Sequence, residues 1–231
     1  MITFLSRIFD LLSPRFCAIC GNRLSISEQS ICSVCDLHLP RTHYADCAED
    51  NEMARLLWHL MNIQRAAALF FYQPGSPPSL MIEKLKYGKR PDIAFDLGQL
   101  TAREIKSKGF FEGIDFIIPL PLSKKRLRER GYNQSEEIAK GIAEETGLTV
   151  RTDIVLRRSF QQSQTKLGKW ERNENVKGVF RLIKKEDIVG KHILIVDDIM
   201  TTGASILSCA NELEKAGNLR ISVLTLGFTK S

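Results

Sequence analysis

The chain has 231 residues, of which 43% are hydrophobic and 26% charged, and its formal net charge is +6. This composition is that of a globular protein with a packed core, and it excludes long disorder. The basic balance fits a polyanionic partner or a phosphate-bearing ligand without identifying either. No apolar run reaches the ~18 residues needed to cross a bilayer, so we expect no membrane span.

The first sixteen residues look apolar, and Leu5, Ile8, Phe9 and Leu12 recur at helical spacing. This spacing predicts a short amphipathic helix that packs on the protein rather than on a membrane. Charged residues interrupt the run and no small-residue cleavage site follows it, which argues against a signal peptide. We therefore expect a cytoplasmic protein.

Two Cys-x2-Cys pairs follow, formed by Cys17, Cys20, Cys32 and Cys35. Four thiolates at this spacing can close a tetrahedral Zn²⁺ site, which supplies folding energy to a segment too small for its own core. We predict a structural zinc site. Two roles stay open: a ribbon that touches nucleic acid or a partner, and a clip that only fixes the N-terminus.

The remaining chain divides into a connecting helix and a larger domain. We expect residues 1–45 to hold the N-terminal helix and the zinc site, 46–65 to form a linker helix, and 66–231 to form the main domain. The linker helix should bury one face, made of Met53, Leu56, Leu57 and Leu60.

Strand and helix patterns alternate through the main domain. Strands are expected at 66–72, 116–120, 193–196 and 221–227, with helices ending at 84–88 and covering 92–106, 133–145 and 205–216. Alternation of this kind predicts an α/β fold with a parallel sheet flanked by helices. The polar segment 157–177 breaks the rhythm and is expected to be a mobile loop.

The strand at 193–196 leads directly into Asp197 and Asp198. Four consecutive β-favouring apolar residues indicate a central parallel strand, and ligands of open α/β sheets bind at the carboxyl ends of such strands. The next residues, Thr201, Thr202, Gly203, Ala204 and Ser205, form a hydroxyl-rich turn before a helix. Helix amides at such a turn suit a phosphate, whereas two adjacent acids suit sugar hydroxyls, so the spacing indicates a ribose 5-phosphate.

A second anion element follows the strand at 116–120. The proline-rich turn with Leu120 and Pro121 presents backbone amides, and Lys124 and Arg128 belong to a basic run that can meet a pyrophosphate. The alternative is that residues 124–130 are only the solvated basic face of a helix.

Residues 193–205 resemble the signature of type I phosphoribosyltransferases. The resemblance implies that Asp197 and Asp198 hold the ribose hydroxyls and that 201–205 wrap the 5-phosphate. The whole chain resembles the ComF family of competence proteins, also called amidophosphoribosyltransferase-like. The residues that carry this likeness are the four cysteines, Leu85-Lys86-Tyr87, the turn 119–123, Arg128-x-Arg130-Gly-Tyr-Asn-Gln134, Gln164-Thr165, Arg172, Asn175-Val176 and 196–205.

The ComF resemblance implies a protein of DNA uptake that binds 5-phosphoribosyl-1-pyrophosphate (PRPP) or a nucleotide-like ligand together with Mg²⁺. Its implied partners are single-stranded DNA and a DNA-uptake helicase. A second hypothesis is an active phosphoribosyltransferase that acts on an unidentified acceptor, since no nucleobase-reading hood or general base is recognisable. A third is a general nucleic-acid binder, whose affinity would fall steeply with salt.

Overall fold

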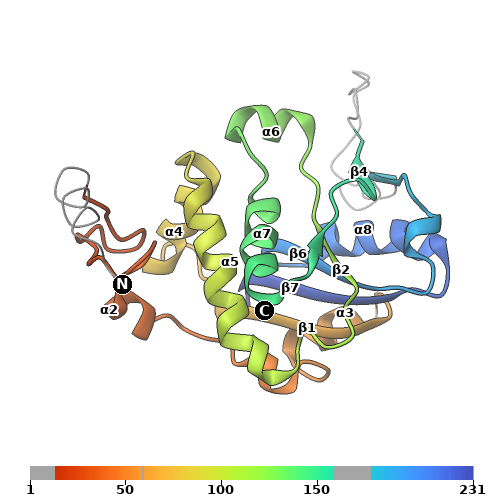
Figure 1. Ribbon diagram of the computed structural model, residues 1–231, viewed down its shortest axis with the longest axis horizontal. Coiled ribbons are helices and arrows are strands. Elements are labelled where there is room, and N and C mark those ends of the chain that lie inside the picture. The colour runs from red at the N-terminus through yellow and green to blue at the C-terminus, as the bar shows by residue number, and fades with distance from the viewer. Residues whose placement is uncertain (1–13, 59, 159–177, 231) are drawn as a thin grey trace, which may run out of the picture.

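The computed structural model describes residues 14–58, 60–158 and 178–230, and its centre is a five-stranded parallel sheet (Figure 1). The strand order is β1-β7-β6-β2-β3, and neighbouring strands pair in parallel throughout. The strands are β1 (Ile63–Phe71), β2 (Phe116–Pro119), β3 (Thr149–Val150), β6 (His192–Met200) and β7 (Arg220–Phe228). The predicted α/β fold with a parallel sheet is confirmed.

The two longest inner strands are buried because both faces of the sheet are covered. From Ile193 to Val196 every residue of β6 is at most 1% exposed, as expected for a strand whose apolar residues do not alternate with polar ones. β7 is buried from Ile221 to its end at Phe228. The central position of the strand before the acid pair thus follows from its continuous apolar run.

Helices cover the two faces in separate groups. One core holds side chains of α4 (Pro77–Tyr87), α5 (Pro91–Ile105) and α7 (Gln134–Thr146) against the sheet. The other core holds side chains of α3 (Glu52–Trp58) and α8 (Ala204–Leu213). The layer order is therefore helices, sheet, helices, as the alternating pattern predicts.

Helices α5 and α7 pack at unusually close range because each presents a glycine to the other. A Cβ atom on Gly98 would lie 2.2 Å from the Ile138 carbonyl oxygen, and one on Gly141 would lie 2.0 Å from the Phe95 carbonyl oxygen. These two positions therefore accept no side chain. The contact fixes α7, whose first turn contributes to the site described below.

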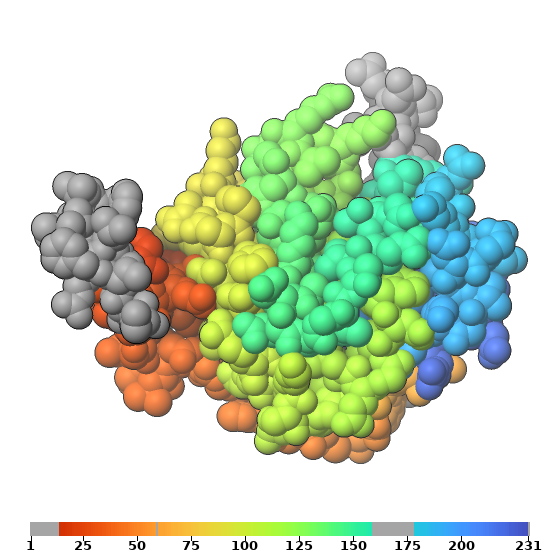
Figure 2. Space-filling model, in the orientation of Figure 1, coloured from red at the N-terminus to blue at the C-terminus, as the bar shows by residue number. Residues whose placement is uncertain are grey.

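The four-cysteine segment, residues 14–39, packs on the main domain (Figure 2). It contains α2 (Ser33–Leu37) and is followed by the 3-10 helix η1 (Tyr44–Cys47). Its apolar residues join the same core as α5, and Ser30 Oγ donates a hydrogen bond to Asp96 on α5 at 2.5 Å. The helix expected over residues 5–12 lies outside the described residues.

The linker region differs from the expectation in one respect. Met53 and Leu57 of α3 are buried and Leu56 is partly buried, but Leu60 is 45% exposed. The prediction for Leu60 is wrong because the helix ends at Trp58, where the amides of Leu60 and Met61 both turn back to the Leu57 carbonyl. The chain then enters β1 at Ile63.

Short elements complete the chain. α6 (Lys124–Arg130) projects beyond the end of α7, and β4 (Val155–Arg157) pairs antiparallel with β5 (Phe180–Leu182) (Figure 1). Most of the expected mobile loop, residues 159–177, lies outside the described residues. The 3-10 turns are η2 (Lys106–Lys108), η3 (Glu186–Ile188) and η4 (Glu214–Ala216). Across the described ranges, no helix is both long enough and apolar enough to span a membrane.

Candidate functional site

The acid pair lies on β6 just beyond the point where the neighbouring strand ends. The last paired residues of β2 and β6 are Pro119 and Val196, whereas on its other side β6 stays paired with β7 through Met200. Asp197 and Asp198 therefore follow the end of β2 and border an opening at the carboxyl edge of the sheet. This is the edge at which open α/β sheets bind ligands.

Few donors surround the two carboxylates. Asp197 accepts hydrogen bonds from Ser135 Oγ of α7 and from the Asp198 amide, both at 2.8 Å. Lys86 Nζ, from the last turn of α4, lies 3.6 Å from Asp198 Oδ2. Burial, and next the negative charge of Asp198, raise the pKa of Asp197 from 3.8 to about 7.

The hydroxyl-rich turn adjoins the acid pair. Residues 201–205 line a cavity of about 90 Å³ together with Asp197, and Thr201, Thr202, Ala204 and Ser205 are exposed. Gly203 has φ +72° and immediately precedes α8, whose free amides begin at this turn. A Cβ atom on Gly203 would lie 3.0 Å from Met200 Cε, so the turn requires glycine for both conformation and space.

A second cavity of about 150 Å³ lies on the other side of the acids. Its wall includes both acids, Leu120 and Pro121 from the turn after β2, and Ser205 from α8. Four cationic side chains line it as well: Lys86, Arg126, Arg130 and Arg157. Opposite charges thus share one cavity, and they come from β6 on one side and from α4, α6 and β4 on the other.

The two basic residues predicted to bind an anion do not line the cavity, whereas two other arginines of the same helix do. Lys124 and Arg128 are exposed on α6 and do not line the cavity, whereas Arg126 and Arg130, one turn apart on the same helix, do. The helix begins where Ser123 Oγ accepts the Arg126 amide at 3.3 Å. The role of Lys124 and Arg128 in anion binding stays a prediction.

Sequence reasoning missed several lining residues. A helical periodicity test would have put Arg126 and Arg130 on one face, and Lys86 stood within a motif already recognised. Arg157 carried no such signal, since it reaches the cavity only through the β4–β5 hairpin, where its guanidinium stacks 5.3 Å from the Phe180 ring. The motif residues between 164 and 176 lie outside the described residues.

The four predicted cysteines come together. Their sulfur atoms all lie within 4.8 Å of one another, and the Cys20 and Cys32 sulfurs are 3.7 Å apart. Tetrahedral zinc with bonds of about 2.3 Å places sulfurs about 3.8 Å apart, so the cluster fits this ion. Burial acts to raise the pKa of Cys17, but the Cys20, Cys32 and Ile19 amides outweigh it and lower that pKa to about 7. In the absence of a metal, burial and the neighbouring thiols raise the pKa of Cys35, and the pKa of Cys32 is raised as well, against the effect of the Cys35 amide. A thiolate is the form that binds metal.

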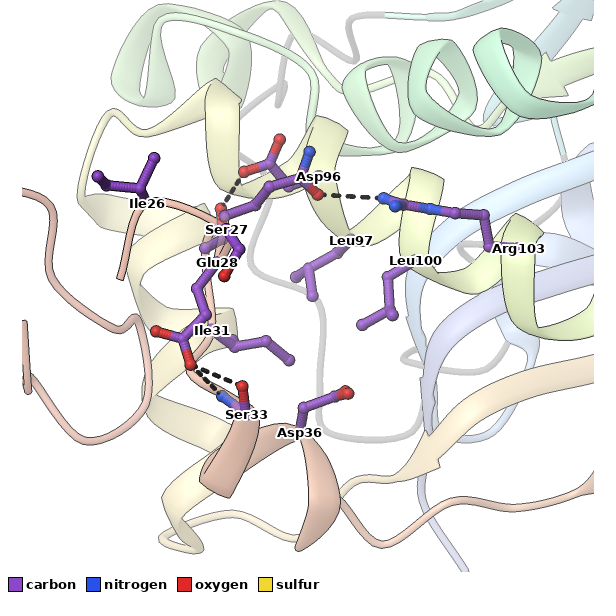
Figure 3. A pocket seen from close by; sticks show the side chains of 12 residues that line it. Ile26, Ser27, Glu28, Ile31, Ser33, Asp36, Asp96, Leu97, Leu100 and Arg103 are labelled. Atoms are coloured by element: carbon purple, nitrogen blue, oxygen red, sulfur yellow. Dashed lines mark hydrogen bonds between the residues drawn. The ribbon is translucent and has the colours of Figure 1, made fainter. Parts of the chain in front are cut away.

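A larger cavity, of about 420 Å³, lies elsewhere, between the four-cysteine segment and α5 (Figure 3). Its acids are already engaged within the protein. Glu28 accepts the amides of Ser25 and Ser33, and Asp36 pairs with Arg41. We interpret this cavity as a gap in the contact between the four-cysteine segment and α5. We interpret the acid pair of β6 as the centre of the functional site.

Comparison with known proteins identifies the family. The family model described as "Phosphoribosyl transferase domain" matches residues 129–228, which include the acid pair and the turn after it. "DNA utilization protein YhgH" of Salmonella typhi is 30% identical over 227 residues, which cover 94% of this chain and 98% of that protein. "Competence protein F" of Haemophilus influenzae is 25% identical, over 90% of this chain and 94% of its own length. The chain belongs to the ComF family.

One further ComF relative and one solved structure are similar to this chain. "Competence protein ComFC" of Bacillus subtilis is 26% identical over 225 residues, which cover 95% of this chain and 88% of that protein. Among solved structures, glutamine PRPP amidotransferase from B. subtilis aligns with a TM-score of 0.41 and 18% identity. That alignment covers 62% of this chain and 30% of the enzyme. The ComF relatives thus match at least 90% of the chain.

Proposed function

We propose that this ComF protein binds PRPP, or the 5-phosphate end of a nucleotide-like ligand, together with Mg²⁺, and uses that site in handling single-stranded DNA during DNA uptake in the cytoplasm. The observation that carries the proposal is the shared cavity, where two acids face four cations beside a hydroxyl-rich helix start. Carboxylates accept ribose hydroxyls, and guanidinium groups and helix amides bind phosphate.

The distribution of charge supports an anionic ligand. Arg157 is partly buried, and among the described residues neither it nor Arg126 has a salt-bridge partner. Burial, and next the positive charge of Arg126, lower the pKa of Arg157. Two guanidinium groups that repel each other across a cavity are stabilised when an anion enters between them. The pyrophosphate of PRPP, with its Mg²⁺, has the charge for that position.

The exposed face of α6 supports the DNA part of the proposal. Lys124, Lys125 and Arg128 are exposed on this helix, which also supplies Arg126 and Arg130 to the wall of the cavity. A strand whose 5-phosphate end enters the cavity would run its backbone along this face. We propose these three cations as phosphate contacts, with a DNA-uptake helicase as the partner that delivers the strand.

Calorimetric titration with PRPP and Mg²⁺ tests ligand binding. Wild-type protein should bind, and Asp198→Asn should weaken binding at least about tenfold, because one charge-assisted acceptor is lost. Glu83→Gln is the matched control: it removes a negative charge from an exposed site on α4 outside the cavity, and it should bind like wild type. Equal affinity of Asp198→Asn and wild type would refute the ribose assignment.

Fluorescence anisotropy with a 5-phosphorylated single-stranded oligonucleotide tests the DNA part. Affinity should fall as salt rises, and removing Lys124 and Arg128 together should reduce the slope of log affinity against log salt concentration by about 1.4, since each phosphate contact on a single strand contributes about 0.7. PRPP should compete with the oligonucleotide. A flat salt titration would end the DNA proposal, and pyrophosphate release from PRPP would establish the alternative of an active phosphoribosyltransferase.

A further inference from the structure

The junction between α6 and α7 reaches into two other parts of the site. Tyr132 Oη donates a hydrogen bond to the Leu85 carbonyl at 2.5 Å, and Gln134 Nε2 donates to the same oxygen at 3.1 Å. Between them, Asn133 Nδ2 donates to the Leu120 carbonyl at 3.2 Å. Three consecutive side chains therefore hold the end of α4 and the turn after β2.

The Leu85 carbonyl oxygen accepts both hydrogen bonds because the helix itself supplies it with no donor. It lies in the last turn of α4, where helix carbonyls have no amide partner one turn further along. Such oxygens are commonly left to water or to a cap. Here two side chains from another part of the chain take it, and Leu85 itself is fully buried. The end of α4 is thereby fixed relative to α7.

The residue after Leu85 is Lys86, the cation nearest to the acid pair. The side chain of Gln134 also accepts a hydrogen bond from Arg130 Nη1 at 2.8 Å. One buried amide thus connects the backbone that carries Lys86 with the guanidinium of Arg130. Both cations line the cavity with the acids.

We propose that Tyr132 and Gln134 are positioning residues that hold Lys86 and Arg130 at the distance from the acid pair that an anionic ligand requires. This inference rests on the proposed function, since it assigns the side chains that set the geometry of the same cavity. Tyr132 acts from outside the cavity, whereas Gln134 is itself part of the cavity wall, so Tyr132 gives the cleaner test of positioning. Asn133 has the separate task of starting α7, where its Oδ1 accepts the Ser135 amide.

The chemistry of both side chains fits this role. Gln134 is 1% exposed, and a buried amide is costly unless its donors and acceptor are used, as they are here. Burial raises the pKa of Tyr132 to about 12, so its hydroxyl keeps its proton and donates at any physiological pH. A side chain that only filled space at either position would need neither polar group.

The test is a double-mutant cycle on PRPP affinity, measured calorimetrically with Mg²⁺. Tyr132→Phe removes one hydroxyl and should weaken binding by at most about fivefold, the limit reached if the full free energy of one ordinary hydrogen bond serves to position Lys86. In a Lys86→Met background the same change should weaken binding further by less than about twofold, because its effect passes through Lys86. Gln134→Met should weaken binding more than Tyr132→Phe, since it releases Lys86 and Arg130 together.

Tyr44→Phe is the matched control, because it also removes a hydroxyl that donates a hydrogen bond, here to Glu52, away from the cavity. It should leave affinity unchanged, and thermal unfolding of each variant shows that the fold persists. Absence of PRPP binding in wild type would refute the proposed function itself. Binding by wild type with undiminished affinity in both Tyr132→Phe and Gln134→Met, or an equal loss with and without Lys86, would overturn the positioning role alone.

Discussion

Replacing Asp197 by asparagine should stabilise the protein while it abolishes ligand binding. The pKa of Asp197 rises from 3.8 to about 7 because the carboxylate is buried beside Asp198. The folded protein therefore binds more protons than the unfolded chain between about pH 4 and pH 7, and its stability falls as pH rises through that window. The rise of the Asp197 pKa from 3.8 to about 7 corresponds to a loss of at most about 4 kcal/mol in the free energy of unfolding above pH 7.

Asparagine keeps an oxygen that can accept from Ser135 and from the Asp198 amide but carries no charge. We expect Asp197→Asn to gain between about 1 and 4 kcal/mol at pH 8, or about 2–4 °C in melting temperature per kcal/mol for a chain of this size. The gain should vanish near pH 4. Thermal unfolding followed by circular dichroism at several pH values measures both effects.

Asp115→Asn gives a control of opposite sign. The His192 backbone amide is the main cause that lowers the pKa of Asp115, so this carboxylate stabilises the fold above the pKa of the unfolded chain and stops doing so as pH falls through its folded pKa. Its replacement should therefore lower stability at pH 8. The reasoning about Asp197 fails if Asp197→Asn is no more stable than wild type at pH 8, or if it keeps the same decline between pH 4 and pH 7.

Two further predictions concern the turn and the cysteines. Gly203→Ala should lower the free energy of unfolding by about 1–2 kcal/mol and weaken the binding of ribose 5-phosphate, because alanine is strained at positive φ and its Cβ would crowd Met200 and Leu57. The control is Gly190→Ala, at φ +73° with open space around it, which should show the backbone strain alone. Chemical denaturation measures both changes in stability. A chelator should release one zinc per chain and increase hydrogen exchange over residues 14–45, and Cys32→Ser should increase hydrogen exchange in the same segment. Metal analysis that finds no zinc in the purified protein would contradict this prediction.

The sequence was most informative where one residue pattern has one physical solution. A run of four β-branched or leucine residues before Asp197 is expected to be buried on both faces, which put the acids on a central strand and at the carboxyl edge of the sheet. The cysteine spacing led to the zinc geometry in the same way. In both places the local pattern determines the position of the functional atoms.

Prediction was weaker where the site depends on contacts between distant segments. Nothing in the neighbourhood of Arg157 indicates that a hairpin of two three-residue strands carries it to the acids, because such short strands have no periodicity to detect. On α6 the basic residues were recognised as a group, but which of them line the cavity depends on how the helix is rotated about its axis. That rotation is set by tertiary contacts, among them the bond from Arg130 to Gln134.

In the described part of the chain, the acids and the cations of the cavity are mostly not paired with one another, which lowers the stability of the free protein but leaves both kinds of charge available to a ligand. If each cation were paired with an acid in the free protein, a ligand would have to break those pairs before it could bind. Among the described residues only Lys86 forms an ion pair with the acids, and its distance of 3.6 Å from Asp198 makes that pair a loose one. Asp197 has two hydrogen-bond donors and, among the described residues, no salt-bridge partner, so burial and next the negative charge of Asp198 raise its pKa. The ligand that we propose, with hydroxyls at one end and phosphates at the other, would supply what each half of the cavity lacks, and its binding would recover the free energy spent on holding the charges apart.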